Sequence, residues 1–298
     1  MTKTYRDFGI DIPTGASGEV RVTCPDCTPQ RKACNQSEKD LAVNTDKGTW
    51  YCHHCGWSGG LHEKTSTEKQ EQPKDYQRPT RKVDPLPEPA MKWFSGRGIS
   101  AGTLRAAHVG FVANALGPRG AIVFPRYKDG EIIAHKYRTG DKKMWQSKAP
   151  EPGFFNRDNA IMSGADTLII TEGEIDALSF IEAGYSNVAS VPDGAPNEGA
   201  KDIQTKMAFL EDGTIDHFDY FVVASDADAP GKRLEMALLE RLGRYRCLRV
   251  SYPAGCKDVN DALVQHGKQA VDRIYKSARF YPIDGLFTAS DIFGDVFG

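Results

Sequence analysis

The 298-residue chain lacks features that would place it in several common protein classes. No apolar run is long enough to span a bilayer, and the polar stretch from Met1 to Asp11 does not match a signal peptide. The formal net charge of −2 excludes a uniformly basic, histone-like binder. No Gly-x-x-x-x-Gly-Lys-Ser/Thr loop occurs, so no P-loop ATPase is expected. We therefore expect a cytoplasmic protein without a membrane partner.

The length and composition predict about two domains. The chain is 40% apolar, which is enough to bury a full core. It has seven cysteines, and four of them stand at metal-binding spacing. Cytoplasmic proteins rarely keep disulfides, so these cysteines indicate metal binding instead.

Two Cys-x-x-Cys pairs near the start, Cys24/Cys27 and Cys52/Cys55, predict one structural zinc ion in a small β module. Four thiolates close the coordination shell, and a module this small needs the metal to fold. His53, His54 and Cys34 are alternative ligands with less regular spacing.

The segment between the two cysteine pairs holds basic, amide and aromatic residues: Arg31, Lys32, Asn44, Trp50 and Tyr51. This combination suits phosphate contact and base stacking on a single strand. For Trp50 and Trp57, packing against the metal knuckle is an equally open interpretation.

The rest of the chain predicts an α/β fold. Residues 62–89 are polar, with almost no large apolar side chain, which is typical of a flexible linker. Apolar runs at 121–125 and 131–138, joined by Asp129-Gly130, predict a hairpin. Later runs, near 167–171, 187–191, 220–224 and 247–252, alternate with helical patterns. This alternation predicts a mostly parallel sheet with helices on both faces.

Three carboxylates follow predicted strands: Glu172, Asp226 and Asp228. Ligands of open parallel sheets bind at the carboxyl ends of strands, and close carboxylates need a cation between them. Mg²⁺ (or Mn²⁺) fits this oxygen-rich set. Taken singly, each acid is also typical of a helix N-cap or a turn. Glu174 and Asp176 either cap the next helix or extend the site.

A basic cluster covers the hairpin and the loop after it: Lys136, Arg138, Lys142, Lys143 and Lys148. It either holds a triphosphate or template backbone, or forms a solvated surface.

Three segments resemble the motifs of the TOPRIM fold: Thr171-Glu-Gly-Glu-Ile-Asp-Ala-Leu178, Ser225-Asp-Ala-Asp-Ala-Pro-Gly231 and Cys256-Lys-Asp-Val-Asn260. With the cysteine module, they resemble the primase half of bacteriophage primase–helicases, the Twinkle-like proteins. The resemblance implies a zinc ribbon at 1–61, a linker at 62–89, a basic subdomain at 90–166, a TOPRIM domain at 167–283, and at 284–298 the start of a connector to an absent helicase domain.

The resemblance also implies a function. It is that of a DNA primase, which joins ribonucleotides into short primers on single-stranded DNA and releases pyrophosphate, in a bacterial or phage-infected cell. A replicative helicase, in cis or in trans, is a further implied partner. The implied catalytic residues are Glu172, Asp226 and Asp228, with Mg²⁺ on all three. Asp258, which follows the last predicted strand, is a further catalytic candidate, either as a metal ligand or as an acid that supports the ligands. The implied triphosphate contacts are Lys136, Arg138, Lys142, Lys201 and Lys232.

Two alternatives stay open. A TOPRIM nuclease needs a tyrosine nucleophile on a separate large domain or an additional nuclease site, and neither is seen in the sequence. A non-catalytic recombination mediator with zinc and TOPRIM domains does not need the complete set of Glu172, Asp226 and Asp228.

Overall fold

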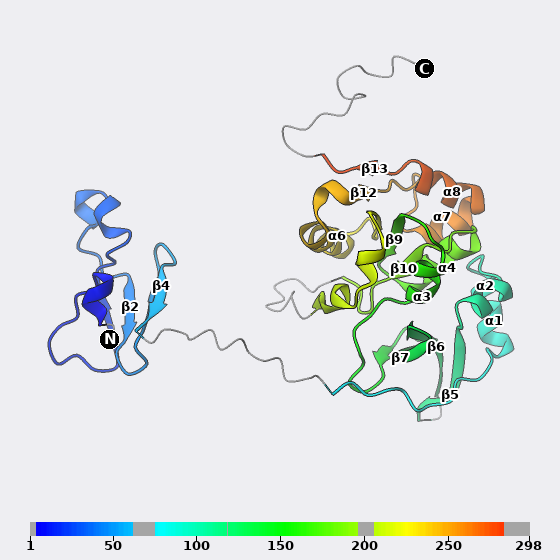
Figure 1. Ribbon diagram of the computed structural model, residues 1–298, viewed down its shortest axis with the longest axis horizontal. Coiled ribbons are helices and arrows are strands. Elements are labelled where there is room, and N and C mark those ends of the chain that lie inside the picture. Colours follow the sequence, from blue (N-terminus) through cyan, green and yellow to red (C-terminus); the bar gives the residue numbers. More distant parts are fainter. Residues whose placement is uncertain (1–3, 62–74, 118, 196–205, 283–298) are drawn as a thin grey trace, which may run out of the picture. The chain divides into compact units, whose positions relative to one another are not determined.

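The computed structural model describes residues 4–61, 75–117, 119–195 and 206–282, which fall into two units within 1–74 and 75–298 (Figure 1). Each unit is described by itself. Lys201, the first half of the expected linker (62–74) and the expected connector (284–298) lie outside the described residues. Within those residues, no helix is both long and apolar enough to cross a membrane.

The first unit is built on a small antiparallel sheet in the order β1-β2-β3-β4. Alternation places Leu41 and Val43 on the buried side of one strand, and Trp50 and Cys52 on the buried side of the next. Ile10 and Val22 are also buried in this core, and partly buried side chains such as Phe8 and Trp57 pack against it. The elements are η1 (Tyr5–Phe8), β1 (Glu19–Val22), η2 (Thr28–Gln30), η3 (Ala33–Asn35), β2 (Leu41–Asn44), β3 (Thr49–Cys52) and β4 (Ser58–Gly60).

The second unit contains the expected mostly parallel sheet, in the order β10-β9-β11-β12-β13. Its first four strands are parallel, and only the short edge strand β13 runs antiparallel to its neighbour. The two central strands are continuous apolar runs because both of their faces are covered. The strands are β9 (Thr167–Thr171), β10 (Val188–Ser190), β11 (Tyr220–Ala224), β12 (Cys247–Arg249) and β13 (Arg279–Phe280). The α/β class is confirmed.

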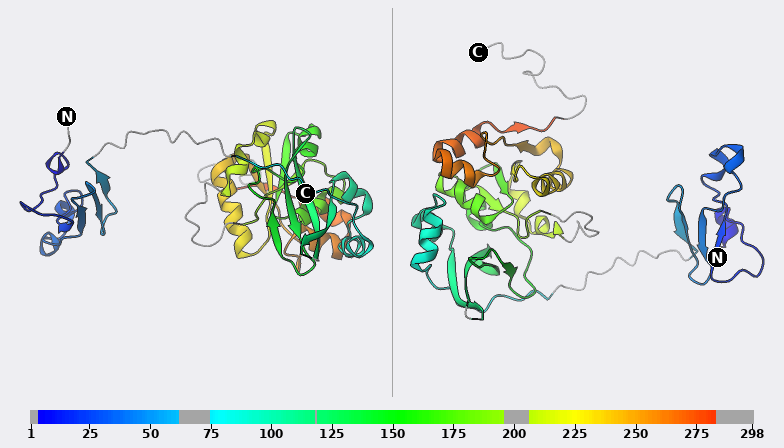
Figure 2. Two further views of the ribbon diagram at one scale, coloured as in Figure 1. Left: turned by 90° about the horizontal axis from the view of Figure 1, so that it is seen from below. Right: turned by 180° about the vertical axis from the view of Figure 1, so that it is seen from behind.

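Helices cover both faces of this sheet, as Figure 2 shows from two sides. Ile169 and Val222 pack with α4, α7 and α8, whereas Leu168 and Phe221 point the other way and pack with α6. The helical elements are α3 (Arg157–Met162), α4 (Glu174–Glu182), η4 (Ala208–Glu211), η5 (Thr214–His217), α6 (Ala229–Leu242), η6 (Arg244–Arg246), α7 (Val259–His266) and α8 (Lys268–Lys276).

A second, antiparallel sheet precedes the parallel one, in the order β5-β6-β7-β8. The expected hairpin is present, and its two turn residues, Asp129 and Gly130, have φ of 54° and 85°. Two positive φ values are typical of the type I′ turn, whose twist matches the strands. The elements are α1 (Glu88–Ser95), α2 (Ala101–Ala106), β5 (Gly110–Leu116), β6 (Arg119–Lys128), β7 (Glu131–Arg138) and β8 (Met144–Gln146).

A buried carboxylate ties three helices together. Glu182, at the end of α4, accepts hydrogen bonds from Ser100 N (2.8 Å) and Thr103 Oγ1 (2.5 Å) and pairs with Lys268 Nζ (2.7 Å). Burial raises the pKa of Glu182, but these donors outweigh it and lower the pKa to about 2. The ionised carboxylate is therefore part of the folded state.

The second half of the expected linker, residues 75–89, differs from the expectation. Asp84 pairs with Phe111 of β5, and Gln77 N donates to Ala149 O (2.9 Å). Arg81 Nη1 donates to Ala115 O (2.9 Å). Backbone pairing and a guanidinium hold this segment on the sheet. Neither feature is visible in the apolar pattern of the sequence.

Candidate functional site

The four cysteines of the first unit form one cluster. Their Sγ atoms all lie within 4.8 Å of one another; Cys24 is 3.8 Å from Cys55, and Cys27 is 3.8 Å from Cys52. Gly56 N bonds to the carbonyl of Cys52, and a tight turn there brings Cys55 back toward Cys52. Four converging thiols are a donor set that fits a tetrahedral metal ion.

The alternative ligands Cys34, His53 and His54 are exposed and do not belong to the cluster. The His53 ring instead contacts Tyr51 edge-on, with the centroids 5.1 Å apart. Arg31 also contacts the cysteine cluster, because it donates to the Sγ of Cys27 (3.3 Å). It also donates to Asp40 (2.7 Å). In this structure Arg31 thus contacts the cysteine cluster, and its phosphate contact stays a prediction.

Packing is the role that the structure shows for Trp50, which is 5% exposed. Its ring lies against Phe8 and Trp57, and a Cβ on Gly59 would come within 2.3 Å of it. Tyr51, the next residue, points to the other face and is half exposed. Strand alternation therefore leaves Tyr51 on the outer face, where a ligand can reach it.

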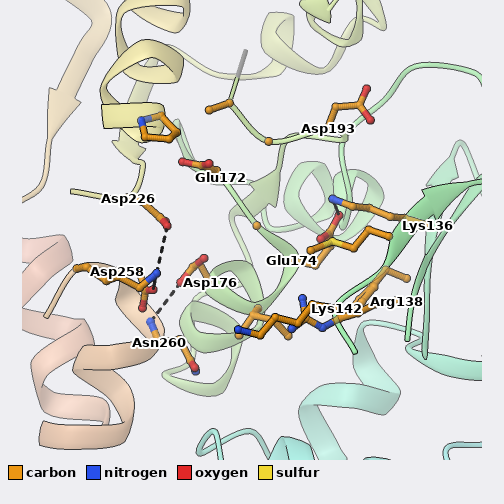
Figure 3. A pocket seen from close by; sticks show the side chains of 18 of the residues that line it. Lys136, Arg138, Lys142, Glu172, Glu174, Asp176, Asp193, Asp226, Asp258 and Asn260 are labelled. Atoms are coloured by element: carbon orange, nitrogen blue, oxygen red, sulfur yellow. Dashed lines mark hydrogen bonds and ion pairs between the residues drawn. The ribbon is translucent and has the colours of Figure 1, made fainter. Parts of the chain in front are cut away.

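In the second unit, acidic residues line a cavity of about 700 Å³ (Figure 3). Strands β9 and β11 are neighbours, with Thr171 opposite Ala224. The residues just beyond them, Glu172 and Asp226, therefore meet at the carboxyl edge of the sheet. Asp176 in the first turn of α4 and Asp258, which caps α7, line the same cavity.

Burial and neighbouring carboxylates raise the pKa of Asp226 and of Asp176. Burial, then Glu172 and Asp258, raise the pKa of Asp226 to about 7. Burial, then Asp258 and Asp226, hold the pKa of Asp176 well above its usual range. Lys257 offsets part of this charge, with its Nζ 3.8 Å from Asp226 and 3.4 Å from Asp258. This side of the cavity thus holds more carboxylates than Lys257 alone can neutralise.

Glu172 has a buried carboxylate with a raised pKa, as expected of a metal ligand or a general base. Burial raises its pKa, although the backbone N–H groups of Ala195 and Asp226 act in the opposite direction. Its Oε2 is buried and has no hydrogen-bond partner among the described residues. An orphaned carboxylate oxygen fits a divalent cation. Within the described part of the chain, however, the four cysteines are the only group of three or more potential ligands close enough together to hold a metal ion.

Cations from the antiparallel sheet line the other side of the cavity (Figure 3). Lys136 and Arg138 point from β7, and Lys142 follows in the loop. Lys136 Nζ pairs with Glu174 (2.8 Å), so Glu174 faces a cation rather than the acidic cluster. Arg138 lies over the ring of Trp93, 5.2 Å from its centroid. Acids and cations thus face each other across one cavity.

The acidic residues of this cavity fall within a stretch of the chain that matches a known family. Residues 169–263 match the family described as Toprim-like. The chain contains a Toprim-like domain. It resembles TOPRIM-type primases, the class to which the primase half of primase–helicases belongs.

Two relatives come from Arabidopsis thaliana. The chain is 29% identical over 320 residues to a Twinkle homolog protein, chloroplastic/mitochondrial, covering 99% of the chain but 44% of the relative. It is 28% identical over 307 residues to a primase homolog protein, covering 95% and 88%. The chain thus spans less than half of the first relative.

A solved structure shares the fold. It is the primase fragment of the bacteriophage T7 primase-helicase protein, with a TM-score of 0.52 and 19% identity, covering 85% of this chain and 97% of that one.

Two of the expected site residues of the Toprim-like domain do not line the cavity. Asp228 instead caps α6 by accepting from Gly231 N (2.9 Å), although its charge contributes to the raised pKa of Glu172. Lys232 is exposed and pairs with Glu235 (2.9 Å). An Asp at the start of a helix favours capping, and the motif resemblance does not reveal that choice.

Other cavity residues were missed from the sequence. Arg97 reaches the site by donating to Asn260 Oδ1 (2.8 Å), and Asn260 N in turn donates to Asp176 (3.2 Å). Arg97 follows α1, far from the motifs, in a Gly-Arg-Gly stretch that carries no metal or phosphate signature. Only the tertiary contact with α7 brings it to the acids.

A buried arginine also supports the loop that closes the cavity. Arg126, 1% exposed, donates to Gln146, and Gln146 donates to Asp193. Asp193, Gly194 and the backbone of Ala195 adjoin Glu172 in the cavity wall. The sequence did carry a signal for Arg126, because it stands in an apolar strand and charged residues are rarely buried without partners.

Proposed function

We propose that the chain is a DNA primase: it joins ribonucleotides into short primers along single-stranded DNA. The observation that carries this proposal is the single cavity in which acids of the Toprim-like domain face cations of the antiparallel sheet. Acids suit metal ions and cations suit a triphosphate, and nucleotidyl transfer needs both. The likeness to a primase homolog protein supports the same reaction class.

In the proposed reaction, a ribose 3′-hydroxyl attacks the α-phosphorus of a ribonucleoside triphosphate. The new O–P bond forms as the bond to pyrophosphate breaks. Lys136, Arg138 and Lys142 bind and orient the triphosphate and neutralise the charge that develops on it. We assign Glu172 as the group that accepts the hydroxyl proton; its raised pKa, and a buried oxygen without a hydrogen-bond partner among the described residues, support this role.

The metal ions belong to the proposal. Glu172, Asp226 and Asp258 would hold Mg²⁺ or Mn²⁺, with Asp228 close behind them; when bound, the ion would draw charge from the phosphate oxygens. Cys24, Cys27, Cys52 and Cys55 would hold one structural zinc ion, and the first unit would contact the template. A replicative helicase, in cis or in trans, is the proposed partner.

One assay tests the function. The full chain is incubated with single-stranded DNA, Mg²⁺ and labelled ribonucleotides, and the products are separated by length. Short RNA products are expected, and Asp226→Asn should yield none. Nicked DNA would instead indicate a nuclease, and bound but unaltered DNA a mediator; either result overturns the proposal.

A further inference from the structure

Two arginines of the candidate active site share one aromatic ring. The Cζ atom of Arg97 lies 4.7 Å from the ring centroid of Trp93, and the Cζ atom of Arg138 lies 5.2 Å from it. Both distances are within the range of cation–π attraction, which is strongest for tryptophan. Both arginines line the cavity, whereas Trp93 is not part of the lining. Trp93 therefore acts on the site through the two guanidiniums.

The end of α1 explains why Arg97 reaches this ring. Residues four apart share one face of a helical turn, and Arg97 follows Trp93 by four positions. Gly98 has φ of 72°, a left-handed conformation that ends the turn directly after Arg97. Arg97 Nη1 donates to Asn260 Oδ1 (2.8 Å), and Asn260 Nδ2 donates to the Arg97 carbonyl (3.0 Å). An indole and an amide thus fix the place of Arg97.

The charges of these two arginines are not neutralised by a neighbouring acid. Among the described residues, neither Arg97 nor Arg138 forms an ion pair, whereas Lys136 in the same cavity pairs with Glu174 (2.8 Å). Burial, then the charge of Arg97, lower the pKa of Arg138, and Glu174 acts in the opposite direction. The folded chain therefore holds two like charges together at a cost, which a bound polyanion would offset.

Packing alone does not account for an indole at this position. Trp93 is partly exposed at the edge of the core, where its ring meets Phe94 edge-on with the centroids 4.8 Å apart. An aliphatic side chain could fill the same place. It would lack the negative ring face that attracts a guanidinium.

We propose that Trp93 is a positioning residue for the triphosphate: its indole holds Arg97 and Arg138 ready to bind the phosphates of the incoming nucleotide. The proposal rests on the function proposed above. An arginine side chain loses rotamer freedom when it binds a ligand, and a ring that has already ordered it removes part of that cost. The indole also attracts both guanidiniums while they repel each other, so it keeps them together before the ligand arrives.

The test compares Trp93→Leu with Trp93→Phe and with Tyr275→Leu in the full chain. Phenylalanine keeps an aromatic face, and leucine does not. Tyr275 is the matched control, because its ring packs at the edge of the same core and lies against Tyr185 rather than against a cation. Binding of ATP and of inorganic tripolyphosphate, each with Mg²⁺, is measured by isothermal titration calorimetry. Circular dichroism checks that each variant is folded.

Trp93→Leu should bind both probes roughly 5- to 30-fold more weakly, from about two- to fivefold for each arginine that the ligand must now order. Trp93→Phe should recover part of this loss, and Tyr275→Leu should bind like the wild type. In primer synthesis, the KM of Trp93→Leu for the nucleotide should rise by the same factor, while kcat changes by less than about twofold. Both arginines are still present in this variant, and only their order before binding is lost.

A second measurement separates the charge of the ring face from the shape of the ring. Trp93 alone is replaced by tryptophans that carry one to four ring fluorines, which weaken cation–π attraction stepwise with little change in size. The affinity for tripolyphosphate should fall with each added fluorine.

Three outcomes overturn the proposal: equal tripolyphosphate binding by the wild type and Trp93→Leu, an affinity that does not depend on the number of fluorines, or an equal loss in Tyr275→Leu. A loss limited to ATP also overturns it, because it would indicate contact with the base rather than the phosphates. Failure here is distinguishable from failure of the primase function. A chain that makes RNA with an unchanged KM in Trp93→Leu refutes only the role of Trp93. A chain that makes no RNA but loses tripolyphosphate affinity in Trp93→Leu refutes only the primase function.

Discussion

The substitution Asp226→Asn should stabilise the protein while removing its proposed activity. Asp226 is 20% exposed, and burial with Glu172 and Asp258 raises its pKa from 3.8 to about 7. Between these two pH values the folded protein keeps a proton that the unfolded chain has released. Folding stability of the wild type therefore falls as pH rises from about 4 to 7 and stays low above pH 7.

The magnitude follows from the shift. About three pKa units at about 1.4 kcal/mol each give roughly 4 kcal/mol, and partial solvent exposure reduces this to about 2–4 kcal/mol. Asparagine has nearly the same shape and carries no charge, so the variant should gain this free energy at pH 8 and nothing near pH 4. This gain in folding stability should appear when EDTA is present. A bound cation would offset the repulsion between the carboxylates, and the substitution would then relieve less of it.

The assay is urea unfolding at pH 4, 6 and 8, with and without Mg²⁺. Saturating Mg²⁺ at ten times Kd should stabilise the wild type by about 1.4 kcal/mol and the variant by less. Asp216→Asn, a change at an exposed residue outside the cavity, serves as the control and should not alter stability. Equal stability of wild type and Asp226→Asn at pH 8 in EDTA would refute the view that these carboxylates repel one another.

Three further predictions concern other parts of the chain. Cys52→Ser should abolish binding of one metal equivalent and unfold the first unit, as measured by metal analysis and circular dichroism, whereas Cys34→Ser should bind metal like the wild type. Gly231→Ala should destabilise the chain by about 2–3 kcal/mol, because the new Cβ would lie 2.1 Å from the backbone oxygen of Asp226. Gly140→Ala, where a Cβ meets open space, is the matched control. Equal melting temperatures of the two variants would contradict the reasoning. Glu182→Gln should lower stability at pH 7 by about 2 kcal/mol. Because the folded pKa of Glu182 is about 2, the wild type should lose this contribution as pH falls from 4.5 to 2, and a variant with the same acid dependence as the wild type would disprove it.

Sequence patterns predicted local features well where one residue type decides the outcome. Cysteine spacing identified the cluster now seen within 4.8 Å, and apolar runs identified the central strands β9 and β11. The turn at Asp129-Gly130 followed from residues that tolerate positive φ. Each of these signals is short in range, so a window of a few residues contains it.

Patterns were less informative where several conformations suit the same residue. Asp228 has the chemistry of a metal ligand and of a helix cap, and the backbone direction of α6 decided for the cap. The contacts of residues 75–89 combine backbone pairing, the Arg81 guanidinium and two isolated apolar side chains, Val83 and Leu86, which form no periodic pattern in the sequence. Arg97 and Arg126 acquire their roles from partners distant in the chain.

By itself, the sequence determined the inventory: four thiols for one metal, acids after buried strands, cations on a hairpin, and an α/β alternation. Tertiary structure decided which of those groups share a cavity, which are neutralised by a neighbour, and how far burial shifts their pKa. Spacing along a chain sets local geometry, but the energy of a charge depends on everything that surrounds it in space, and only folding assembles those surroundings.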